Sequence, residues 1–369
     1  MISITTPVCS PERPVVKRRH ASGFSLIELM IAITIGLIIV TAVIQIYLTS
    51  RTTYTHEEGL ARVQEGGRFG MEFLATDIRM AGYTGCDSSL ATTDINNIAV
   101  PATDAYKLLA GGMRGYRYIG PGTVLSAWEP DLPADYFAAG DVRAGTDVIV
   151  IQRASALDTN LTGNLGTTNA NIQILATAAV SSEISADDIL IISDCTNADI
   201  FRATSASSGA GTMTIAHASS NNSSNDLSKK YDTRAQIMKL VSRAYFIGTG
   251  TGGEPSLMRK ELTNAAASPP IVAQELVEGV EDMRILYGLD TDTTKDYVPN
   301  QYLHADSASI TDWSKVVSIR LALLIRTPTN IQGTDTQTYN LTDATVGPFN
   351  DNRRRHVFSS TIKVRNSGT

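Results

Sequence analysis

Residue patterns that could support catalysis occur in this sequence only as fragments. GTGTGG (248–253) satisfies the G-x-G-x-x-G spacing that brings a phosphate to a helix N-terminus, but the strand-like EPSLMRKEL follows it. A hairpin turn is therefore favoured at this position. The sequence contains no G-x-x-x-x-G-K-[ST] and no G-x-S-x-G motif. The histidines after residue 23 stand singly, without H-E-x-x-H spacing: His56, His217, His304 and His356. We expect neither an enzyme nor a cofactor.

One acidic segment approaches the spacing of a calcium-binding loop. DTDTTKD (290–296) places Asp290, Asp292 and Asp296 at the first, third and seventh places, and carboxylate oxygens are ligands that Ca²⁺ prefers. The sixth place lacks the glycine that such a loop needs, and Gln301 stands where a bidentate glutamate would close it. We therefore favour a polar hairpin and predict no metal site.

Glu28 is the ionisable residue in the most unusual position, because it stands at the start of a long apolar run. Residues 29–48, LMIAITIGLIIVTAVIQIYL, hold no formal charge. At about 1.5 Å per residue, a helix of this length spans the roughly 30 Å hydrocarbon core of a bilayer. The run is too long for an ordinary signal-peptide core, and no small-x-small cleavage site follows it. We expect a membrane-spanning helix.

Charge on the N-terminal side of this run predicts its orientation. The net charge of −6 divides into +3 over residues 1–23 and −9 over the remainder. The cluster Lys17, Arg18 and Arg19 keeps that side cytoplasmic, so the following body is exported. The simplest interpretation is a single-pass anchor in which Glu28 is favoured by the helix macrodipole. The acidic body has no basic stripe with interleaved aromatic residues, so we expect no nucleic-acid partner.

The residues around Glu28 form a more specific pattern than an anchor needs. Gly23 is followed by Phe24, then by SLIE with Glu28 as the fifth residue counted from Phe24, then by the uncharged run. This pattern resembles the type III signal of type IV pilins and pseudopilins. The resemblance implies that prepilin peptidase removes residues 1–23 by cleaving between Gly23 and Phe24, and that Phe24 becomes N-methylated. It also implies that Glu28 pairs with the Phe24 amine of the same or a neighbouring subunit, since a buried carboxylate needs a partner.

Cysteine usage fits an exported chain. Cys9 leaves with the leader, and the remaining Cys86 and Cys195 form an even pair in an oxidising compartment. A bridge between them would close a loop of about 110 residues, worth up to roughly 4–5 kcal/mol in the chain-entropy model. We predict this disulfide; the alternative is two unrelated buried thiols. Metal binding is not expected, because no second Cys or His stands at ligand spacing near either one.

The helix is expected to continue past the membrane with one apolar face, so that it covers residues 24–82. Its apolar side chains recur mostly every three to four residues among charged ones. They are Tyr47, Tyr54, Leu60, Val63, Phe69, Phe73, Leu74 and Ile78. Since glycine weakens a helix by about 1 kcal/mol relative to alanine, we expect a bend or melted turn near Gly66 and Gly67. Gly82 and Gly85 are expected to end the segment.

Residues 83–369 are expected to form a β-rich head. Runs that alternate apolar with polar residues or carry β-branched side chains predict half-buried antiparallel strands. They cover 147–153, 170–180, 187–195, 199–204, 212–218, 239–247, 255–262, 316–326 and 357–366. We expect residues 83–145 to be loop-rich and residues 271–290 to join a short helical or strand start to a strand end. The polar composition of residues 218–230 predicts a loop that cannot pack a core. We expect RRR (353–355) to form a solvated turn. The expected fold class is α+β and pilin-like, with a long N-terminal helix on an antiparallel β-rich head.

Several segments of the expected head and helix resemble PilW-type minor pilins of type IV pili. They are GRFGMEFLATDIRMAGYTGC (67–86), ILIISDCTNADIF (189–201), ELVEGVEDMRILYGLDTD (275–292), WSKVVSIRLALLIRT (313–327) and FSSTIKVRN (358–366). The resemblance implies a low-abundance subunit that primes pilus assembly together with other minor pilins and the major pilin. It further implies a place at the pilus tip beneath a PilY-type adhesin.

Two other classes of protein remain open at this point. A pseudopilin of a type II secretion system would carry the same leader. A membrane-anchored periplasmic binding protein or enzyme would keep its leader uncut at Gly23 and would need a convergent polar site in the head. For the favoured minor pilin we expect a single-pass inner-membrane form with the head in the periplasm, followed by incorporation into the pilus.

Overall fold

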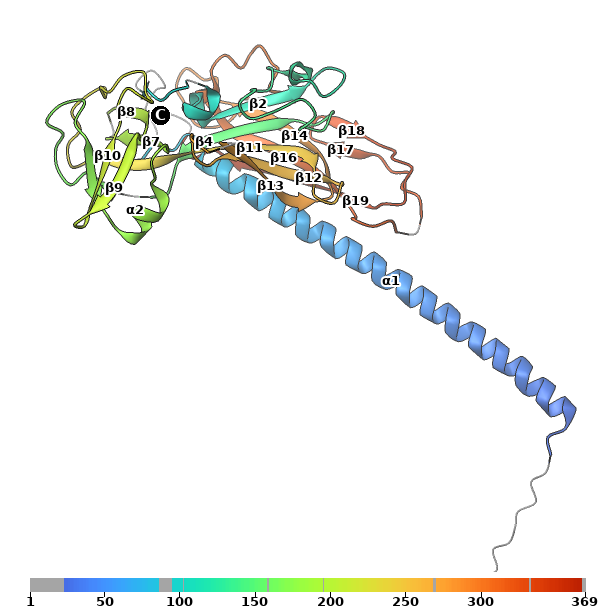
Figure 1. Cartoon of the computed structure of the whole chain (residues 1–369). Helices are drawn as coiled ribbons and strands as arrows, with labels where there is room; N and C mark the ends of the chain where they lie inside the picture. Colours follow the sequence, from blue (N-terminus) through green and yellow to red (C-terminus); the bar gives the residue numbers. More distant parts are fainter. Residues whose placement is uncertain are drawn as a thin grey trace, which may run out of the picture. The chain divides into compact units, whose positions relative to one another are not determined.

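The computed structural model describes residues 23–85, 95–101, 103–157, 159–194, 196–267, 270–331 and 333–366. Its first element, α1, is one continuous helix over Leu26–Met80, which confirms the predicted long N-terminal helix (Figure 1). Within the described ranges α1 is the one helix long and apolar enough to cross a membrane, with a mean hydropathy of 2.7 over its most apolar stretch. The chain divides into two compact units, Met1–Tyr54 and Thr55–Thr369.

β-Strands are the main regular structure of the second unit beyond α1, which confirms the expected β-rich head. In chain order they are β1 (Ile95–Asn97), β2 (Met113–Tyr118), β3 (Trp128–Glu129), β4 (Val148–Ala154), β5 (Thr159–Asn160), β6 (Ile172–Leu175), β7 (Ile189–Ser193), β8 (Ala198–Arg202), β9 (Ser205–Gly209), β10 (Thr212–Ala216), β11 (Gln236–Thr249), β12 (Pro255–Leu262), β13 (Ile271–Glu278), β14 (Val280–Leu289), β15 (Gln301–Leu303), β16 (Val316–Arg326), β17 (Tyr339–Leu341), β18 (Ala344–Val346) and β19 (Arg355–Lys363). A short helix, α2 (Ala178–Glu183), lies between β6 and β7.

The strands form one large sheet and three smaller ones. The large sheet follows the order β1-β8-β7-β11-β4-β2-β3; in addition, β12 and β5 pair with β11, and β13 pairs with β12. The long strand β11 pairs antiparallel with β7 in its first residues and with β4 and β12 further along. The second sheet has the order β15-β14-β16-β19, the third is β6-β10-β9, and β17 and β18 form a hairpin. All of these pairings are antiparallel except β1 with β8.

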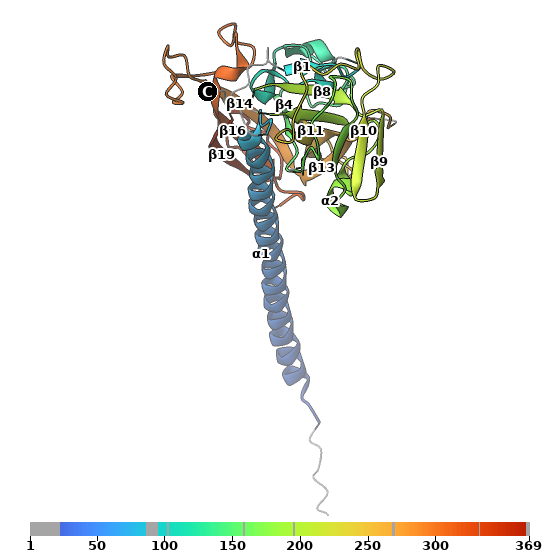
Figure 2. The same cartoon turned by 90° about the vertical axis from the view of Figure 1, so that its left-hand side faces the viewer.

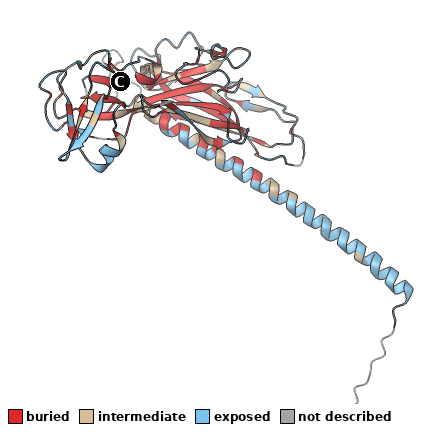
Figure 3. Cartoon of the chain, in the orientation of Figure 1, coloured by how far each residue is buried: buried red, intermediate tan, exposed pale blue. Residues whose placement is uncertain are grey.

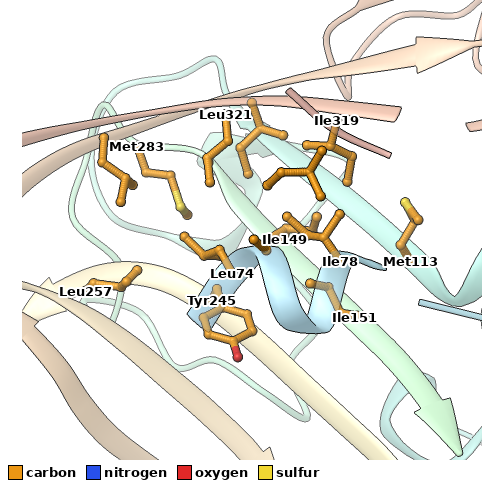
Figure 4. Close-up of a cluster of buried hydrophobic side chains, with 14 of the residues drawn as sticks. Leu74, Ile78, Met113, Ile149, Ile151, Tyr245, Leu257, Met283, Ile319 and Leu321 are labelled. Atoms are coloured by element: carbon orange, nitrogen blue, oxygen red, sulfur yellow. The ribbon is translucent and has the colours of Figure 1, made fainter. Parts of the chain in front are cut away.

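The main core joins the last turns of α1 to the two larger sheets. Leu74 and Ile78 of α1 point into a cluster that also contains Ile149 from the large sheet and Leu321 from the β14–β16 sheet (Figure 4). All four side chains are fully buried. Because each layer buries its apolar face against the other two, this helix end and both sheets are held as one unit.

Smaller clusters cover the remaining faces of the sheets. Trp128, Tyr136 and Phe137, from the segment that joins β2 to β4, pack on another part of the large sheet. Strands β6 and β10 and helix α2 cover β7 and β8, and this group lies away from β14, β16 and β19 in the second view (Figure 2). The β17–β18 hairpin packs on Ala322 and Leu324 of β16.

Three details of the head correct the sequence-based expectations or decide between alternatives that these left open. The predicted strand 170–180 ends early, because Thr177 caps α2 by accepting a hydrogen bond from the Val180 N–H at 3.2 Å. Residues 271–290 contain no helix and form the successive strands β13 and β14. The expectation that residues 218–230 cannot contribute to a core is wrong at Leu227, which is buried with β10 and α2. In each case a partner distant in sequence or a local cap overrides composition.

The expected bend near Gly66 and Gly67 is wrong, since α1 passes through both glycines as a regular helix. These glycines lie where the helix closely approaches the sheets. A Cβ atom added to Gly67 would lie 2.3 Å from the ring of Phe358, and one added to Gly59 would lie 3.3 Å from Thr327. Buried residues on α1 recur from Gly59 to Ile78 (Figure 3). The glycines are therefore retained for contact with the head, although they weaken the isolated helix.

We expect Gly67→Ala to destabilise the protein despite its better helix propensity. The new methyl group would meet the Phe358 ring at 2.3 Å, and overpacking of this kind costs about 1–3 kcal/mol. Thermal unfolding of the full chain in detergent should show a lower melting temperature, and adding Phe358→Leu should restore it. Gly59→Ala, with its nearest contact at 3.3 Å, is the matched control and should be close to neutral. Equal melting temperatures for Gly67→Ala and Gly59→Ala would contradict this account.

Candidate processing and assembly segment

The bond predicted to be cleaved lies immediately before the helix. Gly23, Phe24 and Ser25 are not helical, and α1 begins at Leu26. The Phe24 side chain is 87% exposed, and a Cβ added to Gly23 would have no neighbour within 4 Å. The first α-helical hydrogen bond runs from the Leu29 N–H to the Ser25 carbonyl at 3.2 Å. The main chain on both sides of the Gly23–Phe24 bond is thus ahead of the helical hydrogen-bond ladder.

Glu28 is placed in the first turn of α1, where it forms two hydrogen bonds with Ser25. The Ser25 N–H donates to Glu28 Oε2 at 3.0 Å, and the Glu28 N–H donates to Ser25 Oγ at 3.2 Å. This reciprocal pair is a capping box, with Ser25 as N-cap and Glu28 three residues later. Glu28 was predicted as a site residue and Ser25 was not, although the S-x-x-E spacing of the two residues is a sequence signal for a helix start.

The apolar half of α1 presents an almost uninterrupted hydrocarbon surface. Every residue from 29 to 48 is exposed except Gly36, which is half-exposed. The two threonines in this stretch satisfy their hydroxyl groups within the helix, because Thr34 donates to the Ile31 carbonyl at 2.9 Å and Thr41 to the Leu37 carbonyl at 2.8 Å. Such internal bonding suits a surface that must be covered by lipid or by other apolar helices.

The other half of α1 is fixed to the head by a buried carboxylate. Asp77 is 2% exposed and accepts hydrogen bonds from Arg243 at 3.0 Å and from the Tyr245 hydroxyl at 2.6 Å. Arg153 lies 3.4 Å from the same carboxylate. Burial by itself would raise the pKa of Asp77, but Arg243, Tyr245 and Arg153 together hold that pKa below its ordinary value. Asp77 therefore remains ionised and connects α1 to β11 and β4.

Asp77 is one of the charged residues among which the apolar side chains of this helix recur, and it was not predicted as a site residue. The signal that could have found it is its position three residues after Leu74 and directly before Ile78, which places it on the apolar face. A charged residue in such a position is expected to have a buried partner.

A second ionic network contradicts the prediction that residues 353–355 form a solvated turn. The guanidinium group of Arg355 is 1% exposed and contacts Glu281 at 2.5 Å, Asp335 at 3.0 Å and Asp351 at 2.6 Å. Arg326 also pairs with Glu281, at 2.6 Å. Because Arg355 neutralises carboxylates from β14 and from the segment after β16, it holds that segment onto the sheet.

The acidic segment after β14 forms the predicted polar hairpin, which leads into β15. The Asp290 carboxylate accepts hydrogen bonds from the backbone N–H groups of Asp292, Asp296 and Tyr297 at 2.9–3.1 Å. The three aspartates lie close enough together to share an ion. Backbone bonds already account for both oxygens of Asp290, so the loop needs no ion to explain its conformation. GTGTGG is the predicted hairpin turn between β11 and β12.

The remaining predicted residues do not gather into a site. His56 lies on α1, whereas the ring of His217 contacts the Ala170 carbonyl at 3.0 Å and that of His304 lies 3.3 Å from Asp343. The two cysteines of the predicted disulfide, Cys86 and Cys195, lie outside the described residues, so this pairing stays a prediction.

Comparison with known proteins finds two family matches, one at each end of the chain. Residues 18–44 match the prokaryotic N-terminal methylation motif, and residues 244–366 match the family described as Type IV Pilus-assembly protein W. Among solved structures, a type IV-like pilin from Thermus thermophilus aligns over 84% of this chain and 98% of its own, with 12% identity and a TM-score of 0.32. That degree of similarity identifies no function. No curated protein matches the chain.

Proposed function

We propose that this chain, whose residues 244–366 match the type IV pilus-assembly protein W family, is a minor pilin that takes part in starting pilus assembly. The observation that carries the proposal is the combination of an N-terminal methylation motif on an apolar helix with this family's region in the head. Neither match describes a catalytic family, and we assign the protein a structural role without a cofactor.

Processing is the first step of the proposed function. Prepilin peptidase cleaves between Gly23 and Phe24, removes residues 1–23, and methylates the Phe24 amine. The non-helical and exposed placement of Gly23 and Phe24 supports this assignment, since a peptidase must reach the main chain on both sides of the bond. Before cleavage the apolar half of α1 anchors the protein in the inner membrane, with residues 83–369 as a periplasmic head.

Assembly is the second step. The exposed surface of residues 29–48 passes from lipid to the apolar helices of other subunits, so extraction does not expose it to water. Glu28 then pairs with the Phe24 amine of the same or a neighbouring subunit. The partners are other minor pilins and the major pilin, in a priming complex at the pilus tip beneath a PilY-type adhesin. In the oxidising periplasm Cys86 and Cys195 form a disulfide.

A pseudopilin of a type II secretion system is the second candidate, because the methylation motif serves both machines. The match of residues 244–366 favours the pilus. Deletion of the gene should abolish surface pili and leave type II secretion intact. Loss of secretion with normal pili would support the pseudopilin instead. A membrane-anchored periplasmic binding protein is disfavoured by the same match.

Mass spectrometry of the native N-terminal peptide tests the proposal most directly. We expect sheared pili to contain a peptide that begins with N-methylated Phe24, and we expect strains without prepilin peptidase to retain residues 1–23. An intact leader in the wild type, or a cleaved form confined to membranes and independent of pili, would overturn the assignment. The major pilin from the same preparation is the control for peptidase activity and shearing.

A further inference from the structure

The capping box at the start of α1 determines on which side of the helix boundary the predicted cleavage bond lies. With Ser25 as N-cap, Leu26 is the first helical residue, and Gly23 and Phe24 precede the helix. The Ser25–Glu28 pair satisfies two main-chain N–H groups that a helix start otherwise leaves without partners. The boundary is therefore set by specific side chains and not by the apolar run alone.

The sequence offers a competing start three residues upstream. In ASGFSLIE, Ser22 is a residue type that can cap a helix, but Ser25 and not a glutamate stands three residues after it, so it offers a cap without the capping box. A helix capped by Ser22 would place Gly23 and Phe24 in its first turn. The Gly23 carbonyl would then accept the Ile27 N–H in the i to i+4 pattern. Ser22 lies outside the described residues, so this competition is derived from its sequence position.

Cleavage requires the Gly23 carbonyl to be accessible. Hydrolysis adds water across the Gly23–Phe24 amide: the C–N bond breaks, oxygen from water joins the Gly23 carbonyl carbon, and the Phe24 nitrogen gains the proton. A carbonyl engaged in a helical turn is directed along the helix axis and packed against the next turn. Gly23 and Phe24 are non-helical and exposed in the structure, and the first helical hydrogen bond is accepted by the Ser25 carbonyl and not by that of Gly23.

We infer that Ser25, through its capping box with Glu28, is a positioning residue that keeps the Gly23–Phe24 bond outside α1 and so available to prepilin peptidase. This inference rests on the proposed function, because it presupposes cleavage at that bond. It gives Ser25 a role in processing that differs from the charge pairing proposed for Glu28. Glutamine also closes a capping box, so capping and charge can be separated at residue 28.

The test follows leader removal from the full-length chain in membranes that contain prepilin peptidase. Loss of an N-cap weakens a helix start by about 1 kcal/mol, which shifts the balance between the two starts about fivefold, so Ser25→Ala should slow cleavage by up to about fivefold. Ser25→Thr retains a capping hydroxyl and should cleave close to the wild-type rate. Adding Ser22→Ala to Ser25→Ala removes the competing cap and should recover most of the rate. Glu28→Gln should be cleaved normally, whatever its effect on pilus incorporation.

The outcomes separate this inference from the proposed function. Cleavage of Ser25→Ala at the wild-type rate would overturn the positioning role while leaving the proposed function intact. A Ser25→Thr variant as slow as Ser25→Ala, or no recovery in the double variant, would also overturn it, because side-chain size and not capping would then govern the rate. A wild-type chain that is not cut at Gly23–Phe24 would overturn both.

Discussion

Replacing Asp77 by alanine is expected to lower the free energy of unfolding by about 3–5 kcal/mol, the usual cost of removing one partner from a buried ionic network. The side chain of Asp77 is 3% exposed, and those of Arg243 and Arg153 are 19% and 16% exposed. Without Asp77 the Tyr245 hydroxyl also loses the carboxylate to which it donates. The last turns of α1 should then exchange their amide hydrogens faster than the strands do, because Asp77 connects them to the sheet.

Two variants calibrate this result in the same detergent preparation. Asp77→Asn keeps the shape and a hydrogen-bond acceptor but removes the charge, so its loss should be intermediate. Glu261→Ala removes the other carboxylate that pairs with Arg243. Because the Glu261 side chain is 28% exposed, this change should cost about 1 kcal/mol or less. Equal losses for Asp77→Ala and Glu261→Ala would show that Asp77 has no special role. Since the folded-state pKa of Asp77 is lowered, its contribution should be complete above about pH 4 and be lost as the pH falls further.

A rise in pH from 4 to 8 is expected to destabilise the head, and Asp147→Asn is expected to remove most of that effect. Asp147 joins the two larger sheets, since its N–H donates to the Met283 carbonyl and its Oδ2 accepts the Ile285 N–H, both at 3.0 Å. Its other oxygen has no hydrogen-bond partner in the described part of the chain. Burial raises the pKa of Asp147 to about 7, although Arg284 opposes the shift.

The sign of the pH effect follows from proton binding. Between about pH 4 and pH 7 the folded state holds a proton on Asp147 that the unfolded state has released, so stability falls as the pH rises through this range. Each unit of pKa shift corresponds to about 1.4 kcal/mol, so the loss should reach a few kcal/mol. Asp282, whose pKa burial raises to about 6, contributes in the same direction.

Chemical unfolding of the full chain at a series of pH values measures this prediction. Asp147→Asn should be more stable than the wild type at pH 8 and should show a flatter pH profile. Asp131→Asn, at an exposed aspartate, is the matched control and should leave the profile unchanged. A wild-type protein whose stability increases from pH 4 to pH 8 would contradict the account, because it would mean that Asp147 is ionised at little cost.

Features that depend on neighbours in the chain could be predicted from the sequence. Strands β12 and β16 begin and end at the predicted residues, because regular alternation and flanking turns define them locally. The helix ends at Met80, close to Gly82, whose φ of +74° favours glycine. The predicted helix bend at Gly66 and Gly67 failed for the opposite reason, since propensity describes an isolated helix and not one packed on Phe358.

The sequence by itself determined the apolar span, the orienting charges and the residues around the predicted cleavage bond, because each depends on residues a few places apart. Only the tertiary structure decided which charged side chains are buried. Asp77 meets Arg243 across 166 residues of sequence, and Arg355 meets Glu281 across 74. From the sequence alone, a charged residue is predicted to be exposed, because burying a charge without a partner is costly. Its partner can be identified only in the folded protein, where strands distant in sequence lie side by side.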